Sequence, residues 1–68
     1  MKLIKISERF FRIGLSEFYI RQLPGHESPI WDCLRKEKDG SFLVLESFLL
    51  KKACVAWFRG YLAPGGKR

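Results

Sequence analysis

The residues of this sequence that could perform catalysis are few, and they do not form a recognisable site. The single histidine, His26, is followed directly by Glu27 and Ser28. A general base, its orienting group and a nucleophile normally meet from separate segments of a chain, so three loop neighbours do not predict a triad. The carboxylates in the middle of the chain show no pairing typical of acid–base catalysis: Asp32, Glu37, Asp39 and Glu46. We therefore expect a protein that is not an enzyme and has no small-molecule substrate.

Metal and cofactor chemistry also lacks its usual motifs. Cys33 and Cys54 lie far apart in no Cys-x-x-Cys or Cys/His pattern, and no set of three or four His, Cys, Asp or Glu residues has the spacing of metal ligands. Gly65 and Gly66 follow the last predicted helix instead of opening one, so they do not form a phosphate-binding loop. We expect no metal and no cofactor, and we interpret the cysteines as reduced, buried and structural.

The remaining chemical signal is an alternation of basic and aromatic residues along predicted strands. If the apolar residues of these strands face the core, the outer sheet face carries Arg12, Tyr19, Arg21 and Lys36, with Arg35 and Lys38 near its end. Such a face can lie in a DNA major groove or stack against single-stranded bases. These six residues form the candidate nucleic-acid interface. The competing interpretation is that any antiparallel sheet with one solvated face shows alternating polar residues.

The strands that would carry this face are short aromatic and β-branched runs separated by turn residues. They cover residues 10–15, 18–23, 30–36 and 41–46, while residues 1–6 add an edge strand or continue into the first. Asp39 and Gly40 form the clearest turn. The residues predicted to face inward are Phe11, Ile13, Leu15, Phe18, Ile20, Trp31 and Cys33, and those predicted to face outward include Phe10, Asp32 and Leu34. The buried face of residues 41–46 stays open, because both sets of alternating residues are apolar.

A helix is predicted over residues 48–62, with Ser47 as its N-cap. Its predicted core face consists of Leu49, Leu50, Ala53, Cys54, Ala56, Trp57, Gly60 and Tyr61. The opposite face carries Val55, Phe58 and Leu62, which makes the helix apolar nearly all round. These three residues are the candidate interface for a protein partner or a second copy. Alternatively, the amino-terminal segment or the tail folds back over them.

Taken together, the elements predict an α+β fold, with three to four antiparallel strands packed against one C-terminal helix. One domain is expected over residues 1–62 and a flexible basic tail over residues 63–68, where Pro64 is followed by two glycines. A chain of 68 residues has room for one thin core, and its 47% hydrophobic and 15% aromatic residues favour a folded state over disorder.

The charge balance suggests anionic partners. Thirteen Lys and Arg residues against seven Asp and Glu give a net charge of +6, which attracts nucleic acid or acidic proteins, or simply keeps an apolar chain soluble. The start of the chain has no continuous apolar region typical of a signal peptide, and no apolar run approaches the ~20 residues that span a bilayer. We expect a cytoplasmic protein without membrane contact.

Three segments resemble known DNA-binding modules. Residues 31–42, 47–53 and 56–57 read WDCLRKEKDGSF, SFLLKKA and AW, and they are similar to the three-stranded-sheet-plus-helix modules of phage integrase arm-binding domains and AP2-like domains. The resemblance covers about half of the chain, and Leu50 stands where those modules usually carry a threonine. It implies a sheet that lies in the major groove, with DNA contacts at Arg12, Tyr19, Arg21, Arg35 and Lys36, and an origin in a phage or mobile element.

Two functions therefore compete at this point. The first is a small nucleic-acid-binding accessory protein that uses the outer sheet face, which the charge, the strand arginines and the resemblance favour. The second is a protein-interaction module, an inhibitor or subunit, that docks or dimerises through the C-terminal helix. The absence of catalytic motifs and the apolar outer helix face favour this second function.

Overall fold

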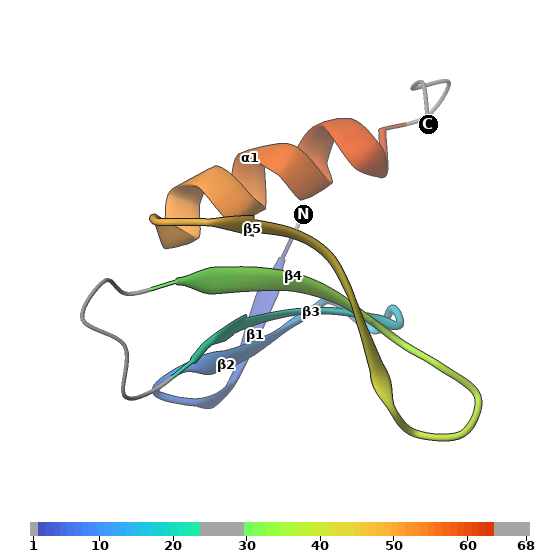
Figure 1. Ribbon diagram of the computed structural model, residues 1–68. Helices are drawn as coiled ribbons and strands as arrows, with labels where there is room; N and C mark the ends of the chain where they lie inside the picture. The colour runs from blue at the N-terminus through green and yellow to red at the C-terminus, as the bar shows by residue number, and fades with distance from the viewer. Residues whose placement is uncertain (1, 24–29, 64–68) are drawn as a thin grey trace.

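The structure, a computed structural model, describes residues 2–23 and 30–63 and shows five antiparallel strands followed by one helix (Figure 1). The elements are β1 (Leu3–Ser7), β2 (Phe10–Ile13), β3 (Phe18–Gln22), β4 (Trp31–Lys36), β5 (Phe42–Phe48) and α1 (Lys51–Tyr61). Each strand pairs with its sequence neighbour, in the order β1-β2-β3-β4-β5, and α1 packs against β3, β4 and β5 on one side of the sheet. The predicted α+β class is confirmed, with one strand more than the three to four expected.

The extra strand comes from the amino terminus, where β1 and β2 are separate elements. A turn at Glu8 and Arg9 divides them, and the register shifts between Lys5 and Ser7. At the other end of β2, Gly14 has φ of +54°, in the left-handed region that favours glycine. The chain leaves the sheet there, so Leu15 is 86% exposed. The prediction that Leu15 faces the core is therefore wrong.

The main core lies between the sheet and α1. The sheet contributes Ile13, Ile20 and Cys33, and the helix contributes Cys54 and Phe58. Because residues four apart share one side of a helix, Cys54 and Phe58 together define the buried stripe. Partly buried side chains surround this centre, among them Leu3, Phe18, Trp31, Leu45, Phe48 and Trp57. The inward positions predicted for Ile13, Phe18, Ile20, Trp31 and Cys33 agree with this arrangement.

The predicted partner patch on the helix is wrong in its central residue. Phe58 is 0% exposed, and Val55 and Leu62 pack against the same core. The apolar stripe is rotated around the helix axis relative to the prediction, toward Phe58. As a result Ala56 and Gly60, predicted to be in the core, are exposed. The residues beyond Ala63 that were predicted to form a tail lie outside the described residues.

The helix begins later than predicted, because the residues before it belong to β5. Phe48 pairs with Trp31 in the sheet, and the Ser47 hydroxyl donates a hydrogen bond of 2.7 Å to Asp32 Oδ1 instead of capping a helix. The N-cap is Leu50, whose extended backbone has φ of −126° and ψ of 140°, and no side chain caps the helix. Leu49 and Leu50 are 63% and 55% exposed, so their predicted place in the core is wrong.

Candidate nucleic-acid interface

The side of the sheet opposite α1, called here the open face, carries most of the predicted interface. Strand register sets Arg12, Tyr19, Leu34 and Val44 in one row across β2 to β5, and Phe10, Arg21, Asp32 and Ser47 in the next. Directly paired residues point to the same face of a sheet. The outward positions predicted for Arg12, Tyr19 and Arg21 therefore agree with the register.

Three aromatic rings form a cluster on the open face. Phe10 stacks on Tyr19 with ring centroids 5.3 Å apart, and Phe42 meets both rings edge-on, at 5.2 Å from Tyr19 and 5.8 Å from Phe10. Tyr19, in the middle, is only 7% exposed, whereas Phe10 and Phe42 are half-buried. The accessible rings are thus Phe10 and Phe42. The sequence prediction turned Phe10 outward without assigning it to the site, and it left the face of Phe42 undecided.

The cluster exists because β5 bends over the open face. In a flat sheet, the three strand spacings between β2 and β5 would separate their side chains by ~14 Å. The rings of Phe10 and Phe42 are nevertheless in contact. The pairing of β4 with β5 is irregular between Cys33 and Leu34, and such a bulge bends a strand and increases its twist. The strong curvature of β5 is visible in Figure 1.

The open face also contains buried residues. Leu34, predicted to be exposed, is fully buried on this face between its strand partners Tyr19 and Val44. Asp32, also predicted to be exposed, is 4% exposed. Both predictions treated the open face as a flat, solvated surface, which a coiled five-stranded sheet does not provide.

Arg12 is fixed by its own chain. Its Nε–H donates to the Ser16 carbonyl oxygen at 2.9 Å, and Nη2 donates to the Leu15 carbonyl oxygen at 3.3 Å. The guanidinium carbon also lies 5.8 Å from the centre of the Tyr19 ring. Arg12 thereby holds the turn between β2 and β3 and keeps one positive charge beside the aromatic cluster.

Arg21 takes part in a polar link across three strands. Its Nη2 lies 3.9 Å from Asp32 Oδ2, and Ser47 donates to the other oxygen of the same carboxylate. The Nε of Arg21 is buried and has no hydrogen-bond partner. Asp32 therefore offsets part of the charge of Arg21, and the predicted interface residue is in part a structural one.

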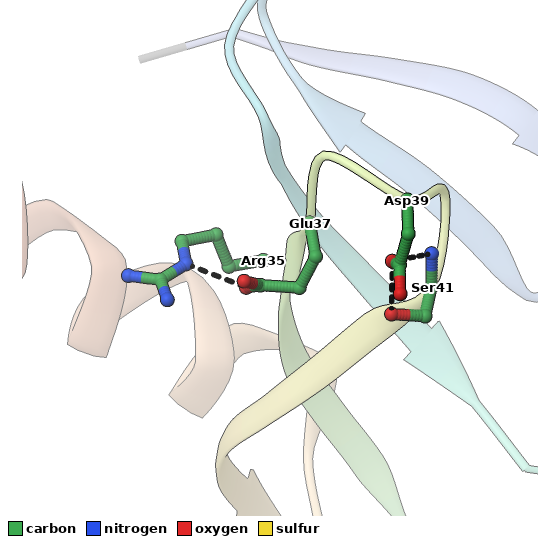
Figure 2. A network of polar contacts seen from close by, with 4 residues as sticks. All are labelled: Arg35, Glu37, Asp39 and Ser41. Carbon is green, nitrogen blue, oxygen red and sulfur yellow. Dashed lines mark hydrogen bonds and ion pairs between the residues drawn. The ribbon is translucent and has the colours of Figure 1, made fainter.

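The hairpin between β4 and β5 sets the two lysines of the interface, Lys36 and Lys38, in solvent. At its tip, Gly40 has φ of +90°, and Asp39 accepts hydrogen bonds from the backbone N–H and the hydroxyl of Ser41, at 2.9 and 2.6 Å (Figure 2). These bonds favour the carboxylate and lower the pKa of Asp39. The predicted Asp-Gly turn is confirmed.

Arg35 does not belong to the open face. It is paired with Phe18, a residue of the helix side, and its Nε–H donates to Glu37 Oε2 at 2.9 Å (Figure 2). Glu37 stabilises the guanidinium and raises the pKa of Arg35. Because neighbouring strand residues point to opposite faces, Arg35 and Lys36 cannot both face outward on the same side. The assignment of Arg35 to the interface is corrected accordingly.

A polar hollow of about 480 Å³ adjoins the aromatic cluster. It lies between the turn that follows β2 and the hairpin that follows β4. Its lining consists of Arg12, Leu15, Ser16, Glu17, Tyr19, Lys36, Glu37 and Lys38. The hollow therefore brings three of the predicted cationic residues together with Tyr19.

The two cysteines are free and fully buried between β4 and α1. The Cys54 thiol donates to the Trp31 carbonyl oxygen at 3.4 Å. Hydrogen bonding between the two thiols, together with burial, raises the pKa of Cys33. In the described parts of the chain, no three His, Cys, Asp or Glu residues gather as metal ligands. His26, Glu27 and Ser28 lie outside the described residues.

Comparison with known proteins adds no relative. No protein-family model matches the sequence, and no curated protein or solved structure matches it either. The resemblance to integrase arm-binding and AP2-like modules therefore stays a prediction. Within residues 2–23 and 30–63, α1 is too short and too polar to cross a membrane.

Proposed function

We propose that the protein binds single-stranded nucleic acid on the open face of its sheet. The observation that carries this proposal is the aromatic cluster, whose half-exposed rings of Phe10 and Phe42 lie on a face that also bears basic side chains. Aromatic rings stack on bases of any sequence, and basic side chains neutralise the phosphates between them. The net charge of +6 supports the same function by attracting a polyanion.

Single strands fit this face better than a duplex groove does. Base edges in the major groove are recognised by arginines whose donors are free for bidentate bonds. Arg12 already donates to two backbone carbonyls, and Arg21 lies beside Asp32. Both can supply charge but are poorly placed to read bases. Lys36 and Lys38 are exposed, and among the described residues they form no ion pair with a carboxylate.

The test is fluorescence anisotropy of a labelled oligothymidylate, titrated with protein at several salt concentrations. Each phosphate contact to a single strand contributes a slope of ~0.7 to the dependence of log affinity on log salt. The double variant Lys36→Ser/Lys38→Ser should therefore lower the slope by about 1.4. Phe42→Leu keeps an apolar side chain beside Phe10 and Tyr19 but removes a stacking ring, and it should weaken binding about tenfold.

The matched control is Lys52→Ser, which removes one exposed lysine from α1 instead of the sheet. Lys52→Ser should reduce the affinity for oligothymidylate less than the loss of either hairpin lysine does. Absence of binding at low salt, or full affinity in Phe42→Leu, would contradict the proposal. Stronger binding to a duplex than to the single strand would contradict base stacking and would indicate recognition of a duplex groove.

We place this activity in the cytoplasm. The two buried cysteines are free, and free thiols suit a reducing compartment. In this proposal the protein is an accessory factor, because the aromatic cluster and the basic side chains around it are assigned to binding and not to catalysis.

A further inference from the structure

A second surface, distinct from the open face, lies along α1. It is a groove of about 520 Å³ lined by Leu50, Lys51, Lys52, Val55, Ala56 and Arg59. Leu50 and Ala56 are exposed and Val55 is half-buried, so the floor of the groove presents apolar carbon to solvent. Leu49, the residue before Leu50, is also exposed. Contiguous exposed apolar surface with polar margins is typical of a docking site.

The margins of the groove are exclusively basic. The sequence of α1 contains Lys51, Lys52 and Arg59 and no acidic residue. The ammonium of Lys51 lies 3.7 Å from the centre of the Phe11 ring, which holds it toward the sheet. Lys52 and Arg59 are exposed, and neither pairs with a carboxylate in the described part of the chain. The complementary partner therefore carries both apolar side chains and carboxylates.

The spacing of the two exposed cations favours a helical partner. Lys52 and Arg59 are seven residues apart, which is ~10 Å along a helix axis. Carboxylates at positions i and i+7 of a partner helix are separated by the same distance and lie on the same side. An extended chain covers ~10 Å in three residues, and its positions i and i+3 point to opposite sides. A helix therefore presents two carboxylates at this distance together with an apolar stripe, whereas residues on one side of an extended chain are ~7 or ~14 Å apart.

We propose that the groove along α1 binds an acidic amphipathic helix of a partner protein. Apolar side chains of the partner lie on Leu50, Val55 and Ala56, and its carboxylates lie at Lys52 and Arg59. This is the helix-in-groove mode of recognition, in which an apolar face supplies affinity and flanking charges set orientation. This surface differs from the predicted partner patch. Phe58 lies in the core, and the exposed apolar residues of the groove are Leu50 and Ala56 instead.

The test uses a synthetic acidic peptide with leucines at i, i+4, i+7 and i+11 and glutamates two turns apart beside them. A shuffled peptide of the same composition is the control, and amide chemical shifts of the full chain report the contact site. The acidic peptide should shift the amides of residues 50–59 and bind at least about tenfold more tightly than the shuffled peptide. Lys52→Ser/Arg59→Ser should weaken binding about tenfold, as expected for the loss of two exposed ion pairs.

Two further variants separate the groove from general charge effects. Ala56→Glu places a carboxylate on the groove floor at an exposed helical position, and it should abolish binding while the amide spectrum stays that of a folded chain. Lys36→Ser/Lys38→Ser removes the same number of charges from the open face and, at about 0.15 M salt, should leave peptide affinity unchanged. Equal binding of the shuffled peptide, or shifts confined to the open face, would overturn the proposal. Binding to phosphatidylserine vesicles through residues 50–59 without binding to the peptide would overturn it as well.

Discussion

At the scale of single residues, the basic side chains of the open face divide by how firmly their own chain holds them. Arg12 is bound to the turn after β2, and Arg21 is linked through Asp32 to Ser47. Their charges are fixed in place and partly offset. Lys36 and Lys38 are exposed on the hairpin and can follow a flexible phosphate chain. In the proposed function, the arginines therefore shape the open face, and we expect the lysines to supply most of the salt-dependent affinity.

Phe58 allows a direct test of where the core lies. It is fully buried and packs against Phe18 with ring centroids 5.5 Å apart. Phe58→Ala should lower the free energy of unfolding by ~3–5 kcal/mol, because it removes contacts and leaves a cavity. Small domains typically have only ~5–15 kcal/mol of stability in total, so the variant should be largely unfolded on warming. Urea unfolding followed by tryptophan fluorescence measures the difference.

The control for this variant is Arg59→Ala, which truncates the exposed neighbour in the same helix turn. It should change the free energy of unfolding by less than about 0.5 kcal/mol, as is usual for surface positions. If Phe58→Ala unfolded at the same urea concentration as Arg59→Ala, Phe58 would lie on the surface, as the sequence predicted for the partner patch.

At the scale of elements, the start of α1 is poorly stabilised. The N-cap is a leucine without a capping hydrogen bond, and the first turn carries two lysines and no acidic residue. The free N–H groups and the helix dipole favour the opposite charge at this end. The helix is therefore held in place mainly by the packing of Cys54 and Phe58 against the sheet.

Leu50→Asp should stabilise the protein. The backbone of residue 50 is already extended, as an N-cap requires, and the leucine side chain is largely exposed, so little burial is lost. A capping side chain contributes ~0.5–2 kcal/mol, and a gain of 1 kcal/mol raises Tm by ~4–8 °C in a domain of this size. Calorimetry measures the shift. Leu49→Asp, one residue outside the cap position, is the matched control and should leave Tm nearly unchanged.

The sequence predicts the individual strands and turns of the sheet more completely than it predicts how they assemble. Period-two alternation gave the faces of Arg12, Tyr19 and Arg21 correctly, because each of these strands is short and regular. Asp39 and Gly40 gave the hairpin through local turn chemistry. The hydrogen bond from Ser47 to Asp32 joins residues 15 apart, and no local pattern predicts it. For the same reason the helix start was placed too early.

The aromatic cluster was missed for a related reason. Phe42 reaches Phe10 only because an irregular β4–β5 pairing accompanies a bend in β5, and a bulge inside an apolar run leaves no mark in the alternation pattern. Leu34 is fully buried on the same face, where alternation alone predicts exposure. Local signals thus predicted which residues share a face, whereas the curvature that turns this face into a candidate site depends on contacts between distant strands.

At the scale of the whole molecule, the two proposed surfaces lie on different layers. The open face belongs to the side of the sheet that α1 does not cover, and the groove belongs to α1 itself. Charges that are further apart than the Debye length, ~8 Å at physiological ionic strength, are largely screened from one another when they are exposed. The surfaces should therefore act independently in physiological salt and interact through their charges in dilute buffer.

This independence can be measured with the oligothymidylate and the acidic peptide together. At about 0.15 M salt, saturating peptide should change the Kd of the oligothymidylate by less than about twofold, because the intervening charges are screened. At about 0.01 M salt, where the Debye length is ~30 Å, the bound peptide should weaken oligothymidylate binding by reducing the net positive charge. Linkage requires the oligothymidylate to weaken peptide binding by the same factor. Competition at 0.15 M would instead mean that both ligands occupy one surface, and the Lys52→Ser/Arg59→Ser variant would show whether that surface is the groove.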